Sequence, residues 1–220
     1  MNIITMNKKE QLLTGIYFLF QQLLLTPILL SLPLPLTLAQ LEFVYFVTNF
    51  LLTLLICRKF LWQNIRYFSK NFVPTVFAGL VVYHLSSTAV GILIQWYMPE
   101  FFNVNDSSIG ILAASDFWLT AVSVVLLVPI TEEVMYRGLL FGCLYRRSKW
   151  AAYFVSALVF SAVHVVGYIG QYSPVQLLLC LLQYIPASLC LGWAYAHTGN
   201  LFAPVLIHTI INAIGNAAMR

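Results

Sequence analysis

Long apolar runs separated by short polar connections dominate the pattern of this chain. A helix needs roughly 20 apolar residues to cross the hydrocarbon core of a bilayer. The runs are continuous and do not alternate, which favours spanning helices over the strands of a membrane barrel. The pattern predicts seven spanning helices, near residues 11–32, 39–57, 73–97, 117–146, 150–168, 175–197 and 200–217.

The predicted fold class is therefore all-α, a polytopic membrane helix bundle of about seven helices that forms one membrane domain. Pro129 lies inside the fourth predicted helix, where we expect a bend, because proline cannot donate the backbone hydrogen bond of that position. The first apolar segment lacks a small-residue cleavage pattern, so we expect it to remain as a helix.

Composition supports a membrane protein and excludes an ordinary soluble domain. Hydrophobic residues make up 61% of the chain and charged residues 8%, with a mean hydropathy of +0.87. A soluble domain carries roughly 25% charged residues. The four cysteines form no CxxC pair, so we interpret them as small buried hydrophobes and not as a zinc or redox motif.

The net charge of +4 predicts an orientation in the membrane and not a nucleic-acid partner. The positive-inside rule assigns clusters of basic residues to the cytoplasmic side. Nine of the eleven basic residues fall in three clusters: Lys8 and Lys9; Arg58, Lys59, Arg66 and Lys70; and Arg146, Arg147 and Lys149. The N-terminus is therefore expected in the cytoplasm and Arg220 outside.

The connections between the helices carry two further expectations. The loop after the third helix holds Glu100, Asp106 and Asp116 and no basic residue, which suits the outer side, and Asp116 is expected to cap the fourth helix. The segment 60–72 is amphipathic, so we expect it to lie on the inner surface. Its Trp62, Ile65 and Phe68 would then face lipid.

Ionisable groups inside the fourth helix are the first candidates for chemistry, because a charge at membrane depth costs several kcal/mol unless it has a partner. They are Glu132, Glu133 and Arg137. Glu133 and Arg137 are four residues apart on one helix face and can pair. Glu132 is offset by about 100° and points elsewhere. This spacing leaves Glu132 available for catalysis.

Two further clusters follow on later helices. Phe160 and His164 are four residues apart in the fifth helix, and His208 and Asn212 are four apart in the seventh. Together with Glu132 these provide a carboxylate, two imidazoles and an amide, which can activate a water and stabilise an oxyanion.

Counting residues predicts how deep these groups lie. Glu132 stands 16 residues before Ser148, in the turn between the fourth and fifth helices, and His164 stands 16 residues after it. Both then lie about 20–24 Å from the turn along antiparallel helices. His208 follows its own turn at 197–200 by about nine residues and would lie about 8–10 Å shallower if the helices began level. A tilt, or a turn that enters the membrane, would close this gap.

Glu-Glu-x-x-x-Arg, Phe-x-x-x-His and His-x-x-x-Asn follow one another on membrane helices, and Tyr136 and Gly138 flank Arg137. This order resembles the CPBP family of intramembrane proteases. That family includes the type II CAAX prenyl endopeptidases, the bacteriocin-processing and self-immunity proteins, and the Abi grouping. The resemblance covers about residues 115–216. It suggests variable N-terminal membrane helices over 1–114 and a catalytic helix core over 115–220, with the active site between the last four helices.

The resemblance implies a role for each motif residue. Glu132 and His164 would activate the water, and His208 and Asn212 would stabilise the oxyanion. Glu133 and Arg137 would be supporting residues. Packing alone suggests that Phe160 shapes the pocket. The residues leave a metal open: Glu132, His164 and His208 could hold a zinc ion with one open position, whereas Asn212 is a poor zinc ligand. We prefer a site without a cofactor and keep zinc as the alternative.

The predicted function is an intramembrane endopeptidase of the CPBP type that cuts a membrane-associated or lipidated peptide or protein. The alternative is a non-catalytic membrane immunity or peptide-binding protein of the same fold. A small ion-coupled transporter is the weakest hypothesis, because it gives no reason for the His-x-x-x-Asn motif. The expected partners are the lipid bilayer and a peptide or prenylated protein. The expected location is a bacterial plasma membrane, crossed several times.

Overall fold

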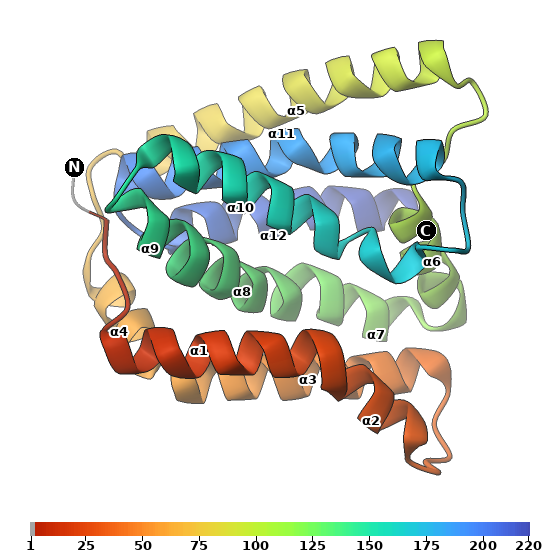
Figure 1. The fold of residues 1–220 in the computed structure, drawn as a ribbon. Coiled ribbons are helices and arrows are strands. Elements are labelled where there is room, and N and C mark those ends of the chain that lie inside the picture. The colour runs from red at the N-terminus through yellow and green to blue at the C-terminus, as the bar shows by residue number, and fades with distance from the viewer. Residues whose placement is uncertain (1–2) are drawn as a thin grey trace.

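The computed structural model describes residues 3–220, and this part of the chain folds into a bundle of helices (Figure 1). Its long helices run back and forth along one direction, and the two chain ends lie at opposite ends of the bundle. The helical segments are α1 (Lys8–Phe20), η1 (Gln21–Leu25), α2 (Thr26–Ser31), α3 (Leu38–Ile56), α4 (Arg58–Arg66), α5 (Phe72–Tyr97), α6 (Val104–Ser115), α7 (Phe117–Ala121), η2 (Val122–Leu127), α8 (Val128–Glu133), η3 (Val134–Phe141), α9 (Gly142–Tyr145), α10 (Lys149–Val163), η4 (Val166–Tyr168), α11 (Pro174–Thr198) and α12 (Phe202–Ala218).

The seven predicted crossings are confirmed. Six helical stretches in the described residues are long and apolar enough to span a membrane. They are Lys8–Ser31, Leu38–Ile56, Phe72–Tyr97, Phe117–Tyr145, Lys149–Tyr168 and Pro174–Thr198. The seventh, Phe202–Ala218, is apolar but shorter. The chain is therefore an integral, multi-pass helical membrane protein.

The fourth crossing combines α-helical and π-helical turns. Residues 122–127 and 134–141 are π-helical, and α8 lies between them. Pro129 closely follows the π-helical segment 122–127 inside the crossing, where its missing N–H removes one backbone hydrogen bond. Asp116 caps the crossing, as predicted: its carboxylate accepts a hydrogen bond from the Leu119 N–H at 3.1 Å. The candidate glutamates thus lie on a short α-helical turn between two wider segments.

The connection between the third and fourth crossings contains a helix that the hydropathy pattern did not predict. α6 spans 12 residues, and the side chain of Asn103 caps it by accepting hydrogen bonds from the N–H groups of Asn105 and Asp106. The helix was not predicted because its first turns contain several polar residues. This helix packs against α3 and brings several polar side chains toward the centre of the bundle.

The predicted surface segment is helix α4, at the end of the bundle that also holds the N-terminus (Figure 1). The side chains of Trp62, Ile65 and Phe68 are exposed, so they are free to contact lipid. The opposite face is anchored, because the Glu10 carboxylate accepts hydrogen bonds from the N–H groups of Lys59 and Phe60 at 3.1 and 3.0 Å. These bonds satisfy donors that the start of a helix leaves without intrahelical partners.

Helices of the C-terminal half form the centre of the bundle. α11 packs against α5, α10 and α12, while α12 also contacts η2 and α8. α1 and α3 pack on the side of the fourth crossing, and α5 lies on the opposite side of the bundle (Figure 1). The N-terminal crossings therefore enclose the segment that carries the three motifs.

Candidate active site

The fold brings the side chains of Glu132, His164 and His208 close together. Glu132 lies on α8, His164 directly follows the last residue of α10, and His208 lies on α12. The Oε2 atom of Glu132 is 4.0 Å from the Nε2 atom of each histidine. This oxygen is buried and has no hydrogen-bond partner among the described residues. A carboxylate oxygen thus faces two imidazole nitrogens across a gap that is too wide for direct hydrogen bonds.

The equal depth predicted for Glu132 and His164 agrees with this geometry. The offset of His208 that level helices would give is absent, because its Nε2 atom is as close to Glu132 as that of His164. The two turns explain the difference: Ser148 is exposed, whereas Asn200 and Leu201 are fully buried. α12 therefore begins inside the protein and not at its surface.

Hydrogen bonds to the N-terminal part of the chain hold this buried turn. The Asn200 side chain donates to the backbone carbonyls of Asn64 and Tyr67, and the N–H of Leu201 donates to the Asn64 side chain at 2.7 Å. The N–H of Ile4 donates to the carbonyl of Gly199 at 3.0 Å. Residues far from the motifs thus fix the height of His208.

Glu133 pairs with Arg137 as the helical spacing predicted. The guanidinium Nη1 lies 3.1 Å from Glu133 Oε1, and both side chains are fully buried. Arg137 also donates to the backbone carbonyl and hydroxyl of Ser188, each at 3.2 Å, and stacks over the ring of Phe160. Phe160 therefore packs beneath the ion pair as well as beside the candidate site.

Glu133 has a second partner that the sequence did not predict. Its Oε1 atom also lies 2.9 Å from the Nδ1 atom of His208. Because a carboxylate accepts hydrogen bonds, this contact assigns a proton to Nδ1 of His208. Glu133 therefore links the buried arginine to the histidine of the third motif.

His164 is oriented by its own helix. Its Nδ1 atom lies 2.7 Å from the carbonyl oxygen of Phe160, which can only accept. The Nδ1 atom therefore carries a proton, and in the neutral imidazole the Nε2 atom that faces Glu132 is free to accept one. This is the tautomer that a general base at this position needs.

Asn212 lies one turn beyond His208 on α12 and lines the same cavity. One N–H of its side-chain amide donates to the carbonyl of Val124 at 2.7 Å, which fixes the amide. A primary amide has a second N–H, and this one can donate to a bound group.

The site opens into a cavity of about 420 Å³ that is lined from several helices. Glu42 of α3 lines this cavity and was missed in the sequence, although a single carboxylate in a 19-residue apolar helix is a detectable signal. Asn103, Asn105 and Asp106 of α6, together with Tyr184 of α11, were also missed. No motif marks these four: the packing of α6 brings Asn103, Asn105 and Asp106 to the cavity, and α11 brings Tyr184 to His164.

The side chains of Glu132, His164 and His208 are not spaced as the ligands of a bound zinc ion would be. Three tetrahedral ligands of zinc, each bound at about 2.1 Å, lie about 3.4 Å from one another. The distances of 4.0 Å from Glu132 Oε2 to Nε2 of His164 and of His208 are longer than this spacing between ligands. No group of three His, Cys, Asp or Glu side chains within residues 3–220 is arranged to hold a metal ion.

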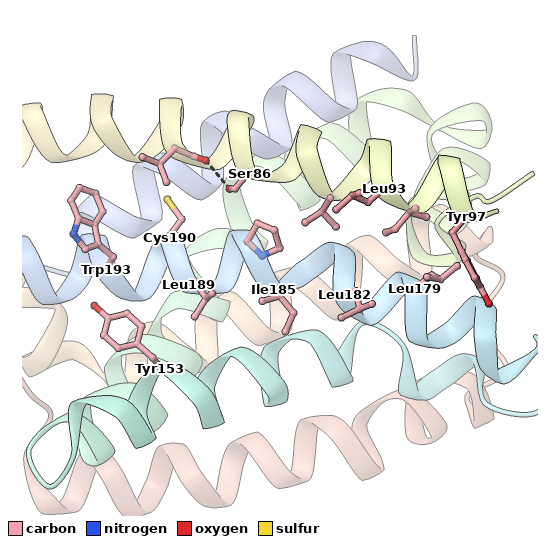
Figure 2. A pocket seen from close by; sticks show the side chains of 14 residues that line it. Ser86, Leu93, Tyr97, Tyr153, Leu179, Leu182, Ile185, Leu189, Cys190 and Trp193 are labelled. Atoms are coloured by element: carbon pink, nitrogen blue, oxygen red, sulfur yellow. Dashed lines mark hydrogen bonds between the residues drawn. The ribbon is translucent and has the colours of Figure 1, made fainter. Parts of the chain in front are cut away.

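A second, larger hollow of about 950 Å³ lies on another face of α11, between α5 and α10 (Figure 2). Tyr97 and Trp193 stand at its opposite ends, and leucines and Ile185 line it between them. Its serine, Ser86, donates to the carbonyl of Val82 and is satisfied. The hollow contains none of the motif residues, so we assign the chemistry to the smaller polar cavity.

The fold and the site define the class: a polytopic helical membrane protein with a glutamate–histidine site enclosed by its helices. Residues 114–214 match the family model described as "Type II CAAX prenyl endopeptidase Rce1-like". This segment contains all three motifs, and it is similar to that family of membrane proteases. The resemblance to the CPBP group is thereby confirmed for this part of the chain.

Two curated relatives match a similar stretch. The "UPF0177 protein YxdF" of Lactococcus lactis is 26% identical over 95 residues, which are 43% of this chain and 47% of the relative. An "Uncharacterized 24.3 kDa protein" of Escherichia coli is 30% identical over 103 residues, which are 46% of this chain and 44% of the relative. The chain thus spans about half the length of the curated relatives it matches. No solved structure gives a significant match.

Proposed function

We propose that this protein is an intramembrane endopeptidase that hydrolyses a peptide bond in a membrane-associated or lipidated peptide or protein. The observation that carries the proposal is the buried Oε2 atom of Glu132, 4.0 Å from Nε2 of both His164 and His208. A water molecule between these atoms would form hydrogen bonds to the carboxylate and to an imidazole.

In the proposed reaction the water oxygen attacks the carbonyl carbon of the scissile bond. Its proton passes to Glu132 or to Nε2 of His164. The carbonyl oxygen becomes an oxyanion, and the second amide N–H of Asn212 donates to it. His208, held at Nδ1 by Glu133, would donate from Nε2 to the same oxygen when both of its ring nitrogens carry protons. The transferred proton then moves to the leaving amine as the C–N bond breaks.

A comparison of newly formed peptide termini tests the proposal without knowledge of the substrate. Membranes from cells that express the wild type, Glu132→Gln or His164→Ala are digested and their terminal peptides are measured by mass spectrometry. We expect a set of new termini with the wild type that both variants lose, because each change removes a group that activates the water.

Two matched variants control this experiment. Glu100→Gln changes an exposed carboxylate outside the crossings. His84→Ala removes a histidine whose Nδ1 lies 2.8 Å from the Leu80 carbonyl, as that of His164 lies near Phe160, but on the exposed side of α5. Both should keep the termini. If the well-expressed Glu132→Gln protein still produced them, the proposed catalysis by Glu132 would fail. If the wild type produced none, a peptide-binding or immunity role would take the place of the peptidase.

Metal dependence is a separate prediction. A site built on Glu132 and His164 alone should keep full activity in a membrane-permeant chelator. A zinc enzyme would lose activity under chelation and regain it with added zinc, because catalytic zinc supplies the activated water. The same terminal peptides, quantified with and without chelator, distinguish the two. Loss and recovery with zinc would overturn the preferred mechanism but not the peptidase assignment.

A further inference from the structure

Tyr184 of α11 lies flat against the imidazole of His164. Their ring centroids are 4.4 Å apart and the ring planes differ by 26°. Phe160 contacts the imidazole as well, with centroids 4.7 Å apart and a tilt of 48°. The imidazole of the proposed base is therefore held between a hydrogen bond at Nδ1 and two aromatic neighbours.

His164 needs such support because of its place in the chain. It directly follows the last residue of α10, so no regular helical turn continues beyond it. The hydrogen bond from Nδ1 to the Phe160 carbonyl fixes one atom of the ring but leaves the plane free to tilt. The plane decides whether Nε2 points at Glu132, 4.0 Å away. A flat contact with another ring restrains that tilt.

The hydroxyl of Tyr184 is held by the start of α6. The Asn105 side-chain amide donates to it at 3.1 Å, and it lies 3.2 Å from Oδ1 of both Asp106 and Asn103, to either of which it can donate its proton. The Asn103 amide in turn donates to the side chain of the neighbouring Gln183 at 2.8 Å. The tyrosine is thus fixed at both ends, by α6 at its hydroxyl and by its backbone in α11.

We propose that Tyr184 is a positioning residue that orients His164, and that α6 holds Tyr184 in place for this task. The inference rests on the proposed role of His164 as the water-activating base. It extends the working site to residues 103–106, outside the segment 114–214 that matches the family model. The hydroxyl is occupied by α6, so the tyrosine acts through its ring and not as a proton donor to the substrate.

The orientation of His164 can be read without any substrate. The protein is labelled with ¹⁵N in its histidine rings and embedded in lipid nanodiscs, and the His164 signals are assigned with the His164→Gln variant. We expect one Nδ1–H tautomer in the wild type. Tyr184→Leu and Asp106→Ala should broaden or average these signals, since both release the ring plane. Ser107→Ala, whose hydroxyl bonds only the backbone carbonyl of Asn103, should leave them unchanged.

Proteolysis supplies the second readout. Misplacing a catalytic group by about 1 Å can cost about a hundredfold in rate, so we expect Tyr184→Leu to lower kcat by about tenfold or more, with KM nearly unchanged. Tyr184→Phe keeps the ring but loses its hydrogen bonds to residues 103–106, so its kcat should lie between those of the wild type and Tyr184→Leu. Asp106→Ala should have little further effect in the Tyr184→Phe background, because it acts through the hydroxyl that this variant lacks.

Two results would overturn the inference. One is a wild-type tautomer signal for His164 in Tyr184→Leu. The other is an equal loss of kcat from Asp106→Ala whether or not the Tyr184 hydroxyl is present. If the wild type cut no peptide at all, the proposed function would fail, while the histidine signals would still decide whether Tyr184 orients His164. Tyr184→Phe and Asp106→Ala serve the same purpose if Tyr184→Leu does not fold.

Discussion

At the scale of single residues, adjacent glutamates have different partners because successive helical positions are rotated by about 100°. Glu133 forms an ion pair with Arg137, and the carboxylate of Glu132 lies opposite the imidazoles of His164 and His208. The spacing predicted this division. It did not predict that Glu133 also binds His208, because that contact joins residues 75 positions apart.

Removing one charge of the buried ion pair Glu133–Arg137 should destabilise the protein. Glu133→Gln leaves Arg137 with an uncompensated charge, and we expect a loss of about 3–5 kcal/mol in the free energy of unfolding. The double variant Glu133→Leu with Arg137→Met removes both charges and should recover most of it. Thermal unfolding in detergent measures these changes.

The double variant also separates stability from function. His208 loses its Nδ1 partner in Glu133→Leu, so peptide cleavage should stay low although the fold is stable again. Recovered cleavage in this variant would contradict the role assigned to the contact between Glu133 and His208.

At the scale of helices, the fourth crossing depends on a close approach of α4. A Cβ atom added at Gly138 would lie 2.8 Å from the ring of Phe60 and 2.9 Å from the end of Met6, and Phe60 is fully buried. Only glycine lets the two helices meet at this distance. Hydropathy predicted both helices, but a pattern of apolar positions contains no information on which glycine is a contact.

We therefore expect Gly138→Ala to destabilise the protein by about 1–3 kcal/mol, because a packed core resists added atoms. Gly91→Ala is the matched control, since a Cβ there meets nothing within 4 Å. Alanine is favoured over glycine inside a helix by roughly 0.5–1 kcal/mol, so the control should be neutral or slightly stabilising. Equal unfolding temperatures of Gly138→Ala and Gly91→Ala would refute the contact.

At the scale of the whole molecule, seven crossings put the two chain ends on opposite sides of the bundle (Figure 1). The exposed turn at Arg146 and Arg147 lies at the same end as the N-terminus. Basic residues gather at this end, so the positive-inside rule predicts that it faces the cytoplasm.

Reporter fusions check this orientation. Alkaline phosphatase, which is active only after export, should be active when fused after Arg220 and inactive when inserted at Ser148. A fluorescent protein that matures in the cytoplasm should give the opposite result. An active phosphatase at Ser148 would reverse the predicted orientation and leave the fold unchanged.

Sequence alone determined the helical class, the number of crossings, the ion pair of Glu133 with Arg137 and the three motifs of the site. These follow from local rules: apolar length, helical spacing and residue chemistry. Residue counting placed His208 shallower only for helices that begin level, and it left a tilt or an entering turn as alternatives. The helices do not begin level, because the turn at Asn200 is buried.

Only the tertiary structure decided the height of α12, the second partner of Glu133, and the contact of α6 with Tyr184, whose ring stacks on His164. The turn at Asn200 is buried because Asn64 and Tyr67, more than a hundred residues earlier, satisfy its polar groups. Such contacts depend on which distant helices pack together, and this packing cannot be predicted from the periodic pattern of apolar residues along the chain.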